Sequence, residues 1–319
     1  MIHPPLFGAR PVTRFLLVPL LFLLTLAAPA RADYQPRAEA VAEHTYAIVG
    51  PLGQRSPAND GLNANYGFIV TASGVILVDS GASRLGAEKI AQAIRAVTDK
   101  PVRWVVNTGS QDHRWLGNAY FAAQGAEIIA LARTAATQAQ FVEQQLAGLK
   151  NFLGDRLTGT APLHAQKPLQ QDSATLELGG ETLVLAYTDA HYPGDAWVWL
   201  PQRGVLFSGD LVYVDRLLGV LPMSSVRQGQ KAFHRLAALK PKAIVPGHGR
   251  VCDLAKAQAE TGDYYDFLSE KIGAAAKDRE PLDATLNKYA DLPRFKGLEN
   301  YDALHRANMN RAFVEFEAP

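Results

Sequence analysis

The stretch Asn107-Thr108-Gly109-Ser110-Gln111-Asp112-His113 follows an apolar, strand-like run and is the first of four fragments that decide the fold. The three later fragments also place an Asp or His where an apolar run ends: Asp189-Ala190-His191-Tyr192-Pro193-Gly194-Asp195, Ser208-Gly209-Asp210 and Pro246-Gly247-His248-Gly249. Because side chains at the same ends of neighbouring strands converge in space, this pattern builds one site from distant residues. Neutral imidazole and carboxylate are the ligands that a borderline-soft divalent metal such as zinc prefers.

Strand-like and helix-like patterns alternate along the chain, which predicts α/β or α+β layering. We expect one large domain over residues 33–254 and a mostly helical extension, residues 255–319, packed on the same domain. The expected strands are 45–49, 65–70, 74–79, 102–107, 126–131, 173–178, 181–188, 196–201, 204–208 and 243–245, and the expected helices are 85–97, 116–124, 134–153 and 228–239.

The first 32 residues have the pattern of a secretory signal peptide. Arg10 and Arg14 form a positive segment, and Phe15–Ala28 is an apolar run too short to span a bilayer comfortably. Ala30-Arg31-Ala32 then fits the small-x-small cleavage rule. An uncleaved N-terminal anchor is the alternative. With cleavage, and with no later stretch of membrane-spanning length, the mature protein is expected to be soluble, without a membrane partner, and periplasmic or secreted.

The composition excludes several classes of function. The chain of 319 residues has a formal net charge of +1, so no strong field attracts nucleic acid, and no nucleic-acid partner is expected. Cys252 is the only cysteine, so the chain contains no intramolecular disulfide. A small-molecule substrate is the expected partner, and the sequence indicates no particular oligomeric state.

The order and residue patterns of the four fragments resemble those of the metallo-β-lactamase superfamily of hydrolases. In that family the first fragment reads Thr-His-x-His-x-Asp-His, with Gly-Asn a few residues later. Here the Asn-Thr start, the Asp112-His113 pair and Gly117-Asn118 match the family. Gly109, Ser110 and Gln111 stand where two histidines are expected, and with the Asp-His pair aligned the segment is one residue short.

The resemblance covers about residues 40 to 252 and implies a four-layer αβ/βα sandwich. Val78-Asp79-Ser80-Gly81 matches an early Asp-x-Gly turn of the family, in which the Asp commonly accepts a hydrogen bond from the metal ligands. The chain is also similar to zinc metallohydrolase-like proteins associated with periplasmic quinoprotein systems, with a degenerate first metal motif.

The same resemblance implies that one of the family's two metal sites survives. Asp112, His113, His248 and the bridging Asp210 provide a full set for the second metal, whereas the first metal keeps only His191 and a share of Asp210. Three strong ligands plus water suffice for a catalytic zinc, and one imidazole does not. We therefore expect one tightly bound Zn²⁺, with the second weak or absent.

These residues predict a secreted, zinc-dependent hydrolase of an ester, thioester, lactone or amide. In this hypothesis Asp112 orients the attacking water or accepts its proton, and His191 binds the substrate or protonates the leaving group. A non-catalytic periplasmic descendant, binding a metal or cofactor in a quinoprotein system, is the main alternative. A plain β-lactamase is a third hypothesis, because fold alone does not select the substrate.

Overall fold

The computed structural model describes residues 33–318, together with residues 1 and 3. Asp33–Pro319 form one compact unit. The predicted signal peptide, residues 1–32, falls almost wholly outside the described residues and stays a prediction. Within the described part of the chain, no helix is both long enough and apolar enough to cross a membrane.

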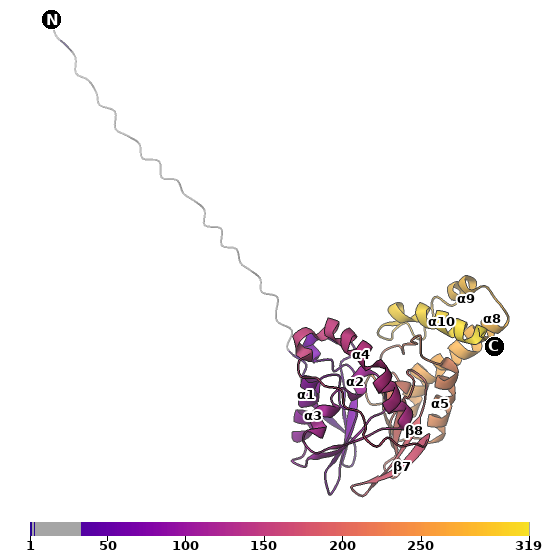
Figure 1. Ribbon diagram of the computed structural model, residues 1–319. Coiled ribbons are helices and arrows are strands. Elements are labelled where there is room, and N and C mark those ends of the chain that lie inside the picture. The colour runs from indigo at the N-terminus through magenta and orange to yellow at the C-terminus, as the bar shows by residue number, and fades with distance from the viewer. Residues whose placement is uncertain (2, 4–32, 319) are drawn as a thin grey trace. The chain divides into compact units, whose positions relative to one another are not determined.

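Two β-sheets form the centre of the molecule (Figure 1). The first has the order β1-β2-β3-β4-β5-β6 and is mixed, since β4, β5 and β6 run parallel and the others antiparallel. Its strands are β1 (Ala38–Ala42), β2 (Thr45–Ile48), β3 (Tyr66–Val70), β4 (Val75–Val78), β5 (Val102–Val106) and β6 (Glu127–Ile129). The second has the order β11-β10-β9-β8-β7, with β7 (Ser173–Leu178), β8 (Glu181–Tyr187), β9 (Ala196–Leu200), β10 (Val205–Phe207) and β11 (Ala243–Val245).

Successive side chains of the central strands point to opposite faces and so bury two different layers. On β3 and β4, Phe68 and Leu77 pack with α1 (Arg84–Arg95), whereas Ile69 and Ile76 pack against the inner face of the second sheet. The outer face of the second sheet is covered by α5 (Val226–Ala238). Helix, sheet, sheet and helix therefore follow one another, which confirms the predicted mixed α/β sandwich.

The remaining helices connect the strands or follow the second sheet. They are α2 (Asp112–Trp115), α3 (Asn118–Ala122), α4 (Ala132–Leu153), α6 (Leu254–Ala257), α7 (Asp263–Phe267), α8 (Gly273–Lys277), α9 (Leu282–Lys288) and α10 (Tyr301–Glu317), with short helical turns η1 (Pro57–Asn59), η2 (Gly154–Leu157), η3 (Gly209–Leu211), η4 (Gln258–Gly262) and η5 (Leu268–Ile272).

Two local predictions differ from the structure. The helix expected over residues 116–124 corresponds to α3 (Asn118–Ala122), but the separate short helix α2 (Asp112–Trp115) before it was not predicted. Gln111 is extended there, and the Asp112 carboxylate favours the first turn of a helix. Strand β1 was not predicted; its side chains are mostly exposed or half-buried, so the sequence there lacks a buried apolar pattern.

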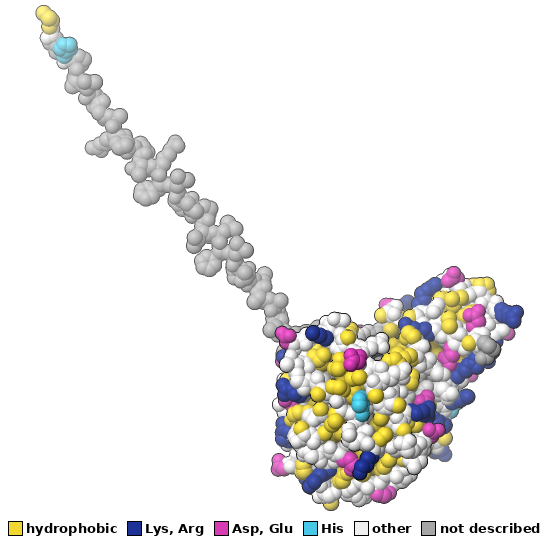
Figure 2. Space-filling model, in the orientation of Figure 1, with side chains coloured by type: hydrophobic (Ala, Val, Ile, Leu, Met, Phe, Trp, Pro, Cys, Tyr) yellow, Lys and Arg dark blue, Asp and Glu magenta, His cyan; other side chains and the backbone are white. Residues whose placement is uncertain are grey.

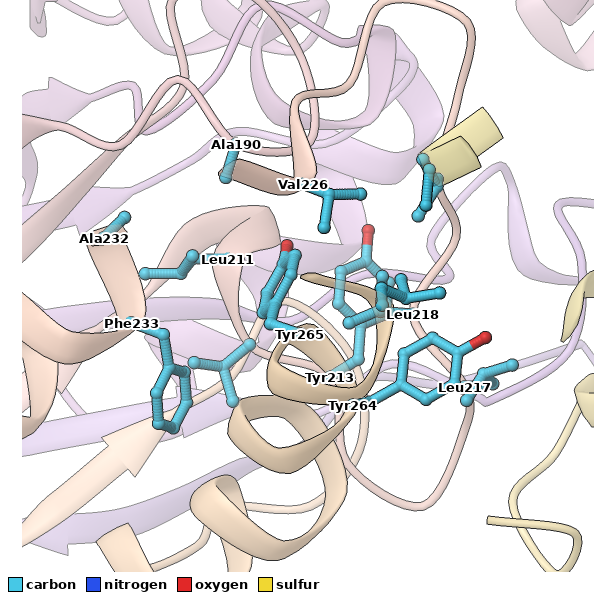
Figure 3. Close-up of a cluster of buried hydrophobic side chains, with 14 of the residues drawn as sticks. Ala190, Leu211, Tyr213, Leu217, Leu218, Val226, Ala232, Phe233, Tyr264 and Tyr265 are labelled. Atoms are coloured by element: carbon cyan, nitrogen blue, oxygen red, sulfur yellow. The ribbon is translucent and has the colours of Figure 1, made fainter. Parts of the chain in front are cut away.

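The C-terminal helices share a core with the second sheet. Figure 3 shows Tyr264 and Tyr265 of α7 beside Tyr213, Leu217 and Leu218, which come from the chain that follows β10. All five side chains are buried. Helical structure after residue 254 therefore agrees with the sequence, whereas the proposed domain boundary at that residue stays a prediction.

The last helix is tied to the site-bearing half of the chain by polar contacts. Glu315 of α10 accepts hydrogen bonds from the Ser225 hydroxyl at 2.7 Å and from the Val226 amide at 2.7 Å, at the N-terminus of α5. Asn308 bonds the backbone of Val220 and Leu218, each at 2.8 Å. These bonds hold α10 against the segment that follows Asp210.

The surface carries mixed charge. On the face in Figure 2, Lys and Arg side chains are interspersed with Asp and Glu. This face therefore has no large region of a single sign, in agreement with the formal net charge of +1.

Candidate metal centre

The four sequence fragments lie at strand ends, as predicted. His113 is in α2, a short distance after β5, and His191 is in the loop between β8 and β9. Asp210 lies in η3 directly after β10, and His248 follows β11. Gly249 has φ +96°, and a Cβ there would stand 2.0 Å from the Val214 carbonyl oxygen, so the turn that aims His248 requires glycine.

Three of the predicted ligands converge. One ligand atom from each of His113, Asp210 and His248 lies within 4.8 Å of the others, and all three residues are buried. His113 Nε2 is 3.0 Å from Asp210 Oδ2, and His248 Nε2 is 3.4 Å from Asp210 Oδ1. Two imidazoles around one carboxylate match the donor set that zinc takes in proteins.

The hydrogen bonds of the imidazoles set their tautomers. His248 Nδ1 lies 2.8 Å from the Asn63 carbonyl oxygen, and His191 Nδ1 lies 2.8 Å from that of Gly219. A carbonyl only accepts, so Nδ1 carries the proton in each ring and Nε2 keeps a lone pair. Burial lowers the pKa of His248 to about 3 and also lowers that of His191, so both rings are neutral at neutral pH.

Asp210 is held as a carboxylate. Burial alone would raise its pKa, but the positive charge of Arg114 and the contact with His113 hold the pKa of Asp210 well below its usual range. Asp210 therefore remains an anion facing two ring nitrogens, which is the state needed of a metal ligand.

Asp112 and His191 do not belong to the group of three. Asp112 forms an ion pair with Arg55 and accepts a hydrogen bond from the His113 backbone at 2.7 Å. Burial opposes ionisation of Asp112, yet Arg55 and His113 lower its pKa to about 2. The geometry thus favours Asp112 as the partner that orients His113, whose Nδ1 lies 3.2 Å from Asp112 Oδ1, and not as a fourth ligand.

Arg114, which no sequence pattern singled out, lies at the centre and is 1% exposed. Its guanidinium donates Nε to Asp210 Oδ2 at 3.1 Å, a second bond to Asp210 Oδ1, and Nη1 to Asp79 Oδ2 at 3.2 Å. Asp79 also accepts two bonds from Thr108, at 2.7 and 2.6 Å. The early Asp turn therefore supports Arg114 and, through it, Asp210.

These positions favour an alignment of the first fragment with the family pattern that contains no gap. Aligned from Thr108, the family pattern puts His113 where the family has Asp, and Arg114 where it has the last His. That alignment agrees with the structure, in which His113 faces Asp210 and Asp112 does not. The sequence signal that could have identified Arg114 is a charged residue directly after the motif histidine, because a charged residue in a buried turn requires partners.

The position of the first missing histidine is filled by other atoms. A Cβ at Gly109 would lie 2.9 Å from Asp195 Oδ1 and 3.1 Å from Arg114 Cγ. Asp195 is buried, its Oδ1 has no hydrogen-bond partner among the described residues, and burial, together with the nearby Asp210, raises its pKa. A side chain at residue 109 therefore requires Asp195 or Arg114 to move.

A sequence profile of the Metallo-beta-lactamase superfamily matches residues 59–248, which is more than half of the chain and includes the Asp and His residues of all four fragments. The protein belongs to the metallo-β-lactamase superfamily. Among curated proteins, it is 27% identical over 210 residues to metallo-beta-lactamase IND-1 of Chryseobacterium indologenes, covering 64% of this chain and 77% of that protein. Members of this superfamily that resemble the chain are hydrolases. The comparison therefore supports a hydrolase type of function in general for this protein.

Solved structures of the superfamily share the fold. A metallo-beta-lactamase from Pontibacter korlensis has a TM-score of 0.58 at 20% identity and covers 73% of this chain and 99% of its own. The FIM-1 enzyme of Pseudomonas aeruginosa, in its mono-zinc form, has a TM-score of 0.58 at 18% identity, with 75% and 98% covered. A double mutant of the sec-alkyl sulfatase PisA1 has a TM-score of 0.69 at 16% identity, with 88% and 50% covered.

Proposed function

We propose that this superfamily member is a hydrolase that uses a single zinc ion held by His113, Asp210 and His248. The observation that carries the proposal is the convergence of these three buried ligand atoms within 4.8 Å. Three protein ligands and an open position are the usual composition of a catalytic zinc site.

The donor set fits a metal ion. His248 Nε2 and Asp210 Oδ1 face each other at 3.4 Å, and neither atom carries a proton in the states derived above. Two acceptors that face one another in a buried place are stabilised by a cation between them. His113 is already oriented by Asp112, so the ligand rings need little rearrangement.

A bound zinc would supply Lewis acidity and would bring the pKa of a coordinated water to about 7. The chain's own residues supply the rest. His191 keeps a lone pair on Nε2 and, because its Nδ1 proton is bound to Gly219, is oriented to exchange a proton at Nε2 with substrate. The low pKa of Asp112, about 2, makes it a weak base, so its expected part is to hold His113 and Arg55.

The substrate class in this proposal is an ester, thioester, lactone or amide, and the site of action is the periplasm or the extracellular medium. The signal-peptide pattern of residues 1–32 supports the second point. A β-lactam remains one member of this class, to be compared with the other acyl substrates in a chromogenic assay.

A second candidate is a non-catalytic, metal- or cofactor-binding protein of a periplasmic quinoprotein system. The cofactor-binding form of this candidate, without a catalytic metal, is favoured by Arg114, whose guanidinium already neutralises Asp210 and so weakens the attraction of that carboxylate for a dication. The space beside Gly109 is also closed to the histidine of the family's first site.

Elemental analysis of the purified mature protein tests the proposal. We expect about one zinc per chain, lost in His248→Ala and in His113→Gln but kept in Asp112→Asn. Hydrolysis of an acyl substrate should disappear with the metal. A folded wild-type protein without metal would favour the non-catalytic candidate, and loss of zinc in Asp112→Asn would restore Asp112 as a ligand.

A further inference from the structure

The orientation of the His191 ring depends on one backbone carbonyl. His191 Nδ1 donates to the Gly219 carbonyl oxygen at 2.8 Å, which leaves the lone pair of Nε2 free for substrate. Gly219 lies within residues 217–221, which form neither helix nor strand. Because no regular structure fixes this segment, the position of the carbonyl depends on whatever else bonds its backbone.

The side chain of Asn308 in α10 bonds the backbone on both sides of Gly219. Its Oδ1 accepts from the Val220 amide and its Nδ2 donates to the Leu218 carbonyl oxygen, each at 2.8 Å. Asn308 is 0% exposed, so bulk water does not compete for these two bonds. The side-chain amide therefore pairs with this irregular segment as the backbone of a neighbouring strand would.

One planar group joins Asn308 to His191. The Gly219 carbonyl and the Val220 amide belong to the same peptide unit, whose atoms lie close to one plane. His191 bonds the oxygen of this unit and Asn308 bonds its N–H. A rotation of the peptide plane would break both bonds, so Asn308 restrains the carbonyl that orients the ring.

The amide of Asn308 is itself oriented by a buried chain of hydrogen bonds. His305 Nε2 lies 2.9 Å from the Tyr289 carbonyl oxygen, which only accepts, so Nε2 carries the proton of this ring. His305 Nδ1 therefore accepts from the Tyr264 hydroxyl at 2.9 Å. The hydroxyl oxygen is left to accept from Asn308 Nδ2 at 3.3 Å. All donors thus agree with an amide whose nitrogen faces Leu218 and whose oxygen faces Val220.

We propose that Asn308 is a positioning residue of the hydrolase, which fixes the peptide between Gly219 and Val220 so that His191 keeps its proton on Nδ1 and its lone pair on Nε2. The inference rests on the proposed function for the part that His191 plays with substrate. The hydrogen bonds themselves do not depend on it. Asn308 acts through the peptide and not on the substrate.

This inference assigns a part in the site to the C-terminal extension. The family profile matches residues 59–248, so α10 lies beyond the matched part of the chain. None of the three converging ligands, His113, Asp210 and His248, comes from the extension either. Its contribution is then the geometry of His191, which stands outside that group of three.

The competing explanation is that α10 only packs against the second half of the molecule. Met309, the next residue of α10, is 0% exposed in the same apolar core. Met309→Ala therefore removes packing from α10 and leaves the bonds to Leu218 and Val220 in place. It is the matched control for a loss of stability alone.

Two variants remove the bonds of Asn308. Asn308→Leu keeps about the same volume without a donor or acceptor, and Asn308→Ala is a smaller change in case the leucine variant does not fold. The segment stays attached to the C-terminal extension in both variants. The Leu217 amide still bonds the Glu299 carbonyl at 2.9 Å, and Arg311 still bonds the Val220 carbonyl.

The first measurement is the tautomer of His191, read from the ¹⁵N resonances of its ring in the purified mature protein and assigned with His191→Gln. We expect the Nδ1-protonated form alone in the wild type and in Met309→Ala. Asn308→Leu and Asn308→Ala should show a second population, or an averaged resonance, with the proton on Nε2. Since no turnover is required, this result is independent of the hydrolase assignment.

An unchanged tautomer in both Asn308 variants would overturn the proposal. The same redistribution in Met309→Ala would also overturn it, because loss of packing alone would then explain the effect.

The second measurement compares kcat and KM for an acyl ester, with zinc content determined on the same samples. We expect kcat to fall about 10- to 100-fold in Asn308→Leu while KM changes by less than about twofold, because proton exchange at His191 is misaligned and substrate binding is not. Zinc content should stay at the wild-type level. An equal fall of kcat in Met309→Ala, or a loss of zinc in Asn308→Leu, would contradict a positioning role at His191.

Discussion

Arg114 contacts more groups of the metal centre than any single predicted ligand does. It joins Asp210, Asp79 and the carbonyl oxygens of Asn65 and Gly247 in one buried network. A buried ion pair contributes little relative to an apolar replacement of both partners, but removal of one partner leaves an uncompensated charge. The arginine therefore sets the position and charge of Asp210 before any metal binds.

Arg114→Met should lower the free energy of unfolding by about 3–5 kcal/mol, because Asp210 and Asp79 then remain buried without their cation. Urea unfolding of the metal-free protein measures this change. Arg250→Met is the matched control: Arg250 is an exposed partner of Asp215, and its loss should change little. A small effect at Arg114 would mean that the two carboxylates take up protons at no cost.

At the level of helices and strands, the strand ends position the ligands, and α10 holds the segment that follows the ligand Asp210. Asn308 and Glu315 bond residues 218–227, and these continue from Asp210 through Tyr213 and Arg216. The carboxylate of Glu315 also lies at the N-terminus of α5, where the helix dipole favours negative charge.

Glu315→Ala should reduce stability by about 1–2 kcal/mol, since it removes a cap from α5 and an anchor from α10. Hydrogen exchange of the amides of residues 213–220 should also become faster. Chemical unfolding and exchange mass spectrometry measure the two effects. Glu317→Ala, at an exposed position two residues later, is expected to leave both unchanged. Unaltered exchange in Glu315→Ala would show that apolar packing alone holds this segment.

For the molecule as a whole, buried neutral histidines make stability depend on pH. The pKa of His248 is about 3 in the folded chain, and that of His191 is also lowered, against about 6.5 in an unfolded chain. Below about pH 6.5 the unfolded state therefore binds protons that the folded state does not, so acid favours unfolding.

The metal-free protein should lose stability as the pH falls from about 6.5 toward 3, by about 1.4 kcal/mol per pH unit from His248, and the lowered pKa of His191 adds a loss in the same direction. Urea midpoints across this range provide the measurement. His248→Gln should flatten the dependence, and His234→Gln, at an exposed site, should not. A dependence confined to pH values below 4 would assign it to carboxylates instead.

Strand and helix periodicity predicted the mixed α/β class, and the resemblance to the family implied the sandwich. Strand-end placement, which is a local pattern, predicted that residues of the four fragments converge. The sequence did not predict the partners of the ligands. Arg114 and Arg55 act through tertiary pairing, and no spacing rule reports which carboxylate a given arginine meets. The assumption that the first fragment is one residue short was wrong for the same reason. Only the fold shows that His113, and not Asp112, faces Asp210.

The bonds from Asn308 and Glu315 have a consequence for the order in which the chain acquires its structure. The segment carrying Tyr213 and Arg216 is synthesised about a hundred residues before the helix that fixes it. While those last residues are still inside the ribosome, the segment after Asp210 lacks the hydrogen bonds that α10 provides. A chain interrupted before α10 thus possesses His113, Asp210 and His248 but none of these contacts.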